Sequence, residues 1–124
     1  MFYSIFIFVL TFNYFLVSDD IVYKEITLTR TSHYSAEEAT GLTSSGIKPE
    51  IGIIALSPDL LKTIDYKTPV LLYDKKSNQI IGMFIVEDKM HCRYKKSADI
   101  FVNNSKIAKS LGVKRNIILI YKKK

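Results

Sequence analysis

Residues 86–102, VEDKMHCRYKKSADIFV, contain two short apolar stretches separated by a polar, basic loop. The first stretch runs into Asp88, and the second begins at Ala98 and Asp99. Short β-branched and aromatic runs on either side of a polar loop predict two strands. Strand ends at one rim of a sheet can bring two acids together, and two carboxylates in one cleft can transfer protons at a glycosidic bond. Asp88 and Asp99 are therefore the candidate catalytic pair.

The rest of the chain is dominated by short strands. Alternating apolar and polar residues, or short apolar runs bounded by turn residues, predict each of them. The first predicted strand, residues 22–30, is half-buried, and residues 32–35 continue it. A turn joins the third and fourth into a hairpin. The predicted strands are VYKEITLTR (22–30) continued by SHYS (32–35), IGIIAL (51–56), PVLLY (69–73), IIGMFIVE (80–87), DIFV (99–102) and NIILIY (116–121).

One or two short helices interrupt the strands. SPDLLKT (57–63) predicts a helical turn, because serine is a good N-cap and proline is tolerated at the first helical position. NNSKIAKSLG (103–112) predicts a short helix that an asparagine caps and a glycine ends, with Ile107, Ala108 and Leu111 on one face. The expected fold class is all-β (mainly β), a compact six-stranded barrel with one or two short helices.

The chain is long enough for one domain, and its first residues differ from the rest in composition. Residues 2–17, FYSIFIFVLTFNYFLV, are almost wholly apolar and are followed by two aspartates. We expect residues 1–18 to be a signal peptide or, since no basic residue precedes the run, an uncleaved N-terminal anchor. Residues 20–124 would then form the folded domain. Both alternatives place it outside the cytoplasm, secreted or in the cell envelope.

The positive charge indicates possible partners, and the cysteine content shows whether the domain can form a disulfide. The net charge is +6, from 18 Lys and Arg against 12 Asp and Glu. In an exported protein such a surface suits anionic wall polymers or lipid headgroups, although solvated lysines explain much of the charge. The sequence shows no nucleic-acid-binding module. With Cys92 as the single cysteine, the domain cannot close a disulfide of its own.

Six motifs, taken in order, resemble those of the three-aspartate domain family. That family is related to rare lipoprotein A-like proteins, expansins and membrane-bound lytic transglycosylase A. The likeness extends over residues 26–121 and implies a double-psi β-barrel, acting as a monomer without a cofactor on the glycan strands of bacterial peptidoglycan. The matching segments are SHYS (32–35), GLTSSG (41–46), GIIALSP (52–58), VEDKM (86–90), ADIFV (98–102) and AKSLG (108–112).

A secreted subset of that family is the most similar, through ALSPDLL (55–61) and DKMHCR (88–93). The sequence departs from the family at two places. Ser57 stands where the first of the three aspartates is expected, which removes one carboxylate from the site. A glycine-rich stretch expected after Asp88 is also replaced, by KMHCRYKKS (89–97). The backbone that lines the groove therefore differs from that of the family.

The resemblance assigns the chemistry to Asp99. In the lytic transglycosylase relatives the corresponding aspartate protonates the leaving glycosidic oxygen. It then accepts the proton of the C6 hydroxyl as that oxygen closes a 1,6-anhydro ring. Such an acid needs a raised pKa, and the neighbouring carboxylate of Asp88 would raise it by repulsion. The reaction requires no metal and no water nucleophile.

Four further residues are candidates for substrate binding. Tyr34 could stack on a sugar ring or be an ordinary half-buried strand tyrosine. Thr43 and Ser45 could donate hydrogen bonds to substrate, or satisfy turn backbone. Arg93 could bind an anionic group, pair with Asp88 or remain solvated.

The neighbouring residues His91 and Cys92 do not suggest a different catalytic or metal site. His91 and Cys92 would point apart in an extended segment, and His33 is the only other histidine, so neither a nucleophile–base pair nor a metal site is expected. Two functions without catalysis remain open. One is an expansin-like barrel that binds wall polysaccharide, and the other is a small envelope-associated protein whose basic surface faces lipid or anionic polymer.

Overall fold

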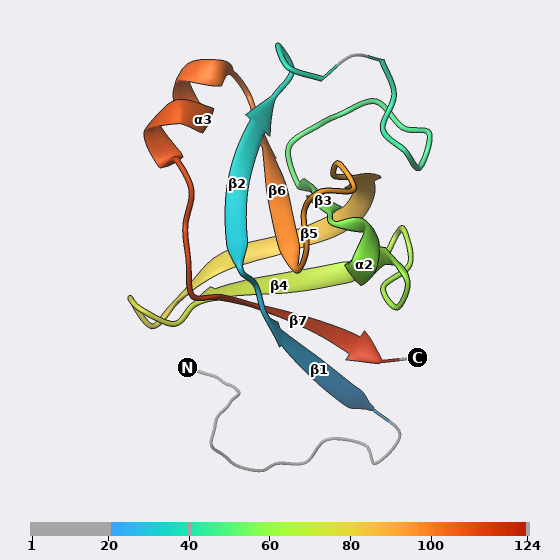
Figure 1. Ribbon diagram of the computed structural model, residues 1–124, viewed down its shortest axis with the longest axis vertical. Helices are drawn as coiled ribbons and strands as arrows, with labels where there is room; N and C mark the ends of the chain where they lie inside the picture. The colour runs from blue at the N-terminus through green and yellow to red at the C-terminus, as the bar shows by residue number, and fades with distance from the viewer. Residues whose placement is uncertain (1–20, 40, 124) are drawn as a thin grey trace.

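The computed structural model describes residues 21–39 and 41–123, so the predicted signal peptide or anchor at residues 1–18 lies outside the described residues. The described chain is mainly β: a single mixed sheet of seven strands with two short helices (Figure 1). No helix in these ranges is both long and apolar enough to cross a membrane. The elements are β1 (Val22–Thr27), β2 (Arg30–Ser35), β3 (Ile53–Leu56), α2 (Pro58–Leu61), β4 (Pro69–Asp74), β5 (Gln79–Lys89), β6 (Ser97–Val102), α3 (Ser105–Leu111) and β7 (Ile117–Lys123).

The strand order is β1-β7-β4-β5-β3-β6-β2. Most neighbours are antiparallel, including the predicted hairpin of β4 and β5. Two pairs are parallel, β2 with β6 and β3 with β5. All four residues of β3 are buried, because this strand has a neighbour on each side and side chains packed on both faces. β3 is therefore the centre of the half of the sheet that carries the two predicted acids.

The first predicted strand is in fact two strands, so the prediction of six strands is wrong by one. β1 pairs with β7 and β2 pairs with β6, although only Leu28 and Thr29 separate them in the chain. The Leu28 N–H donates to the Ile117 carbonyl at 2.8 Å, and the Thr29 N–H donates to the Lys96 carbonyl at 2.8 Å. The backbone thus changes partner strand between two consecutive residues, which an alternating sequence pattern does not reveal.

This connection joins the two edges of the sheet. β1 and β2 are the first and last strands in the sheet order, and two residues link them. The end of β1 and the start of β2 therefore lie close together, as the chain passing from β1 into β2 in Figure 1 shows. Leu28 is 2% exposed and lies within the core. The other core residues are Ile54, Leu56, Leu60, Ile64, Val70, Leu72, Val86, Ala98, Ile100, Ile117 and Leu119.

The two helices are largely as predicted. Pro58 occupies the first turn of α2 after the N-cap Ser57. Asn104 caps α3, its side-chain oxygen accepting from the Ile107 N–H at 2.9 Å. The predicted apolar face of α3 is wrong in part, because Ala108 is buried while Ile107 and Leu111 are 38% and 41% exposed. α3 lies against one end of β2 and β6 (Figure 1), and Ala108 is its buried residue.

Leu28→Ala tests the importance of the connection between β1 and β2. Truncating this buried side chain should lower the free energy of unfolding by about 2–4 kcal/mol, because it leaves a cavity where the two strands diverge. Urea denaturation measures the loss. Val22→Ala on β1, where Val22 is 49% exposed, serves as the control and should change stability by less than about 0.5 kcal/mol. Equal effects of the two substitutions would contradict this role of Leu28.

Candidate functional site

Asp88 and Asp99 lie in one row across the sheet, on either side of Ala55. In the strand register Asp88 of β5 is level with Ala55 of β3, Ala55 is level with Asp99 of β6, and Asp99 is level with Ser32 of β2. Adjacent strands are about 4.8 Å apart, so the Cα atoms of the two aspartates are about 10 Å apart. Residues that are level with one another point to the same face. The small side chain of Ala55 leaves room between the two carboxylates.

A cleft of about 430 Å³ opens over this row, and we call it the acidic cleft. It is large enough for part of a sugar chain, since ligand sites commonly measure about 300–1,000 Å³. Strands β2, β3, β5 and β6 and the loops that follow β2 and β5 form its walls. Its lining residues are Tyr34, Glu38, Ala39, Gly41, Leu42, Pro49, Ala55, Asp88, Lys89, Met90, His91, Tyr94 and Asp99.

Asp99 is the more perturbed of the two acids. Burial raises the pKa of its carboxyl group to about 6. The Ser32 hydroxyl donates to Asp99 Oδ1 at 2.9 Å and acts in the opposite direction, as does the charge of Arg30. Negative charge on Glu38 and, more weakly, on Asp88 raises the pKa. Repulsion from Asp88, which was predicted, thus raises the pKa of Asp99 less than burial does and less than the charge of Glu38 does. The sequence alone did not indicate a role for Glu38.

Asp88 is held in a dense set of hydrogen bonds. Its Oδ1 accepts from the Ser44 N–H at 3.0 Å, from the Ser44 hydroxyl at 3.1 Å and from the Lys89 N–H at 2.9 Å. Its Oδ2 accepts from the Tyr34 hydroxyl at 3.3 Å. Asp88 therefore fastens the loop after β2 to the end of β5 and fixes one wall of the acidic cleft.

Tyr34 lines the cleft from β2, and its hydroxyl donates to Asp88. Its ring meets Phe101 edge-on at 5.4 Å between ring centres, which fixes its orientation. Burial, together with the nearby charge of Asp88, raises the pKa of the Tyr34 hydroxyl well above its usual range, so it stays a hydrogen-bond donor. The side chain remains partly exposed and can offer ring surface to a ligand.

Thr43 and Ser45, predicted to contact substrate, lie behind the cleft wall. The Ser45 hydroxyl donates to Glu87 Oε1 at 2.6 Å, and Thr43 Oγ1 accepts from the Ile47 N–H at 3.2 Å. The two hydroxyl oxygens are 3.1 Å apart. Neither residue is among those that line the cleft in the described parts of the chain. Their contacts fit the alternative, in which they satisfy the loop.

Arg93 lies beside the cleft on an exposed loop. Its guanidinium group is 4.8 Å from the ring centre of Tyr94 and donates to the Tyr94 hydroxyl at 2.8 Å. The guanidinium of Arg30 also lies over this ring, at 5.1 Å. Arg93 thus orients a cleft aromatic, and its contact is with Tyr94 instead of Asp88.

The replaced stretch after Asp88 builds one wall of the cleft. Met90, His91 and Tyr94 all line it. His91 and Cys92 do not point apart as expected, because the chain turns here: His91 Nδ1 is 3.8 Å from Cys92 Sγ and accepts from the Arg93 N–H at 3.1 Å. Within residues 21–39 and 41–123, no three His, Cys, Asp or Glu side chains are grouped to hold a metal.

Ser57, which stands in place of the first family aspartate, is fully buried outside the cleft lining. Its hydroxyl oxygen accepts from the Ser97 N–H at 3.0 Å, and its own N–H donates to the Ser97 carbonyl at 3.0 Å. Ser57 therefore ties the start of α2 to the start of β6, two residues before Asp99. In this chain the position supports the cleft from behind.

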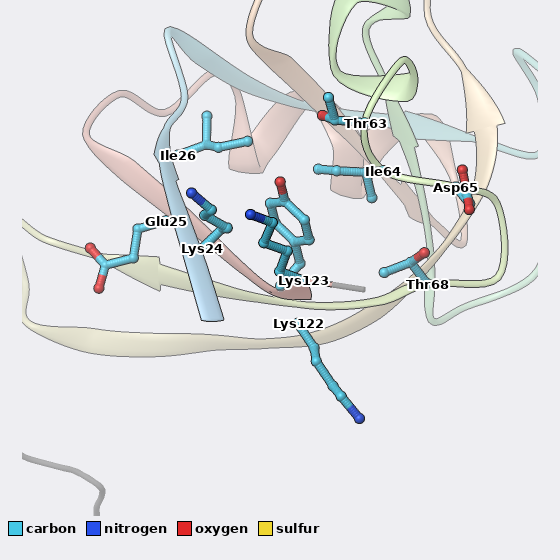
Figure 2. Close-up of a pocket in the computed structure, with 10 residues that line it drawn as sticks. Lys24, Glu25, Ile26, Thr63, Ile64, Asp65, Thr68, Lys122 and Lys123 are labelled. Atoms are coloured by element: carbon cyan, nitrogen blue, oxygen red, sulfur yellow. The ribbon is translucent and has the colours of Figure 1, made fainter. Parts of the chain in front are cut away.

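A second pocket, of about 480 Å³, lies between β1, β7 and the chain that connects α2 to β4 (Figure 2). Lys24 and Lys123 lie among its lining side chains, whereas Lys122 points away from them. Its acids, Glu25 and Asp65, lie on opposite sides, so they do not form a pair. The acidic cleft is the better candidate site.

No protein-family model and no curated protein sequence significantly matches this chain. The likeness of its motifs to the three-aspartate domain family therefore stays a proposal.

The raised pKa of Asp99 predicts a pH dependence of stability. An unfolded aspartate ionises near pH 4, whereas Asp99 in the folded protein holds its proton up to about pH 6. Its contribution to stability is thus complete below about pH 4 and is lost as the pH rises through 6. Asp99→Asn should remove this loss and raise the free energy of unfolding at pH 7.5 by about 1–2 kcal/mol.

Thermal denaturation between pH 4 and pH 8 measures this difference. Glu25→Gln removes an exposed carboxyl on β1, far along the sheet order from β6, and should leave the pH profile as in the original protein. An Asp99→Asn protein whose stability follows the same profile as the original would contradict the burial of an ionisable Asp99.

Proposed function

We propose that the chain is an exported bacterial cell-wall protein that acts on the glycan strands of peptidoglycan, with Asp99 as the acid/base. The observation that carries this proposal is the raised pKa of Asp99 in the acidic cleft. A carboxyl group with a pKa of about 6 can donate a proton and take one back near neutral pH. Export, and residues 1–18 as signal peptide or anchor, belong to the same proposal.

The proposed reaction uses Asp99 twice. Its carboxyl proton passes to the glycosidic oxygen as the bond from that oxygen to the anomeric carbon breaks. The C6 hydroxyl oxygen then bonds to the anomeric carbon, and its proton passes to the Asp99 carboxylate. The acid is restored, and the products are a shorter glycan and a 1,6-anhydro sugar end. Asp88 and Glu38 help keep the carboxyl group protonated before the first step.

Two aromatic side chains support a sugar ligand. Tyr34 and Tyr94 both line the cleft, and rings of this kind stack on the apolar faces of sugars while their hydroxyls reach polar groups. Both rings are held in place, Tyr34 by Phe101 and Tyr94 by two guanidinium groups. The +6 charge favours association with anionic wall material.

The proposal extends to the fold. A double-psi β-barrel is a closed sheet, and the two-residue link between the edge strands β1 and β2 supports closure. The parallel pairs β2–β6 and β3–β5 within an otherwise antiparallel sheet require long crossover connections between their strands. Both features are compatible with the proposed barrel.

A second candidate function is glycan binding without cleavage, as in the expansin-like relatives. The lack of the first family aspartate favours it, since Ser57 stands at that position, is fully buried outside the cleft lining and offers no carboxylate. A cleft without this carboxylate could hold a sugar chain without cleaving it.

Incubating the full chain with purified peptidoglycan sacculi distinguishes these functions. We expect 1,6-anhydro muropeptides, and Asp99→Asn should lower their rate of formation at least about 100-fold, a loss typical of a removed acid/base. Asp74→Asn, at the end of β4 and outside the acidic cleft, is the matched control and should retain activity. Sedimentation with sacculi but no product from any variant would overturn cleavage and support binding. Neither sedimentation nor product would overturn both.

The pH dependence of cleavage provides a separate test. Because the protonated form of Asp99 starts the reaction, kcat/KM should fall about tenfold per pH unit above about 6. Glu38→Gln removes a charge that raises the pKa of Asp99, so it should move this fall to lower pH. Rates measured from pH 4 to pH 8 check both effects. A rate that rises above pH 6, or a Glu38→Gln profile moved to higher pH, would contradict the role of Asp99 as the initial acid.

A further inference from the structure

The outer face of β1, β7, β4 and β5 is apolar, although nothing in the described chain packs on it as a layer. Successive strand residues point to opposite faces, and the buried Leu72, Leu119 and Val70 mark the inner one. The alternate residues therefore point outward. Across the strands they form two level rows, Thr27–Ile118–Tyr73–Ile80 and Glu25–Ile120–Leu71–Met83, flanked by Tyr23, Pro69 and Ile85.

This set, which we call the outer apolar face, is half-buried at its centre, at Leu71, Tyr73, Ile118 and Ile120, and exposed toward its edges. Ile80 is 65% exposed, Met83 59% and Tyr23 59%. An antiparallel sheet with one solvated face normally carries polar residues there. A contiguous apolar patch across several strands marks an interaction surface.

Basic residues border the outer apolar face at both ends. Lys75 and Lys76 lie in the β4–β5 turn, and the Lys75 N–H donates to the carbonyl of Asn116 just before β7. At the other end Lys122 is level with Tyr23 and points to the outer side, away from the neighbouring pocket (Figure 2). The acids here are fewer: Glu25 lies in one row, and Asp74 accepts the N–H of Lys76 within the turn.

We propose that the outer apolar face lies on an anionic lipid surface. Apolar side chains that enter the headgroup region, with tyrosines at its level and lysines reaching lipid phosphates, form the pattern of interfacial binding. β1, one edge of the face, directly follows the apolar residues 2–17, for which membrane contact is predicted. A second copy of the chain fits less well, because its own lysines and its +6 charge would meet like charge.

The outer apolar face shares no residue with the acidic cleft, so this proposal stands apart from the proposed function. The test must also separate the face from residues 2–17, because an apolar N-terminal segment alone could carry the protein to vesicles. A probe fixed on the face makes this distinction.

The full chain with Cys92→Ser carries one new cysteine, Met83→Cys, labelled with an environment-sensitive fluorophore. Mixing with phosphatidylglycerol vesicles should shift its emission to shorter wavelength, and phosphatidylcholine vesicles should produce a much smaller shift. Val113→Cys, at an exposed apolar residue after α3, is the matched control and should show no shift. An unchanged Met83 label on protein that sediments with vesicles would overturn the proposal, since residues 2–17 alone would then make the contact.

The same label tests the competing occupant. A shift without vesicles that grows with protein concentration would show that a second copy covers the face, and it would overturn the lipid proposal. Charge reversal completes the test: Lys75→Glu with Lys122→Glu should weaken partitioning onto phosphatidylglycerol vesicles at least about tenfold. Lys48→Glu with Lys106→Glu, which lie off the face, is the control and should cause a much smaller loss. Equal losses would show that net charge alone attracts the chain, and they would contradict a role for this face.

Discussion

The two-residue connection through Leu28 and Thr29 is the constraint on which the rest of the structure depends. It joins the strands at the two ends of the sheet order, and each of its N–H groups bonds to a different neighbour. This short link brings together the end of one edge strand and the start of the other. One face of the sheet forms the core, and the other face lies outside. The acidic cleft and the outer apolar face both follow from this arrangement.

The site is built around the central strand β3, which lies between the strands that carry the two aspartates. Ala55 is level with an aspartate on each side, so two carboxylates that are well separated in the sequence share one cleft. They are unequal. Asp88 is occupied in holding a loop, whereas Asp99 is partly buried and has a pKa near 6. Burial is the main cause of that shift, so the fold around Asp99 matters more to its acidity than the partner acid does.

Much of this structure could be predicted from the sequence. Apolar runs between turn residues located the strands, and Asn104 and Pro58 marked the helix starts. The division of the first strand could not be predicted, because the alternation of side chains continues while the backbone changes partner. The position of Glu38 in the cleft could not be predicted either, because it depends on how the loop after β2 folds back. Thr43 and Ser45 lie in the loop after β2, but a hydroxyl pattern in the sequence does not show which way the loop faces.

Asp99 is an acid with a pKa of about 6 that lines the acidic cleft. An NMR titration of the side-chain carboxyl carbon of Asp99 in the full chain measures this most directly, with the signal assigned by its absence in Asp99→Asn. We expect a midpoint at about pH 6. A midpoint near pH 4, the value of a solvated aspartate, would contradict it.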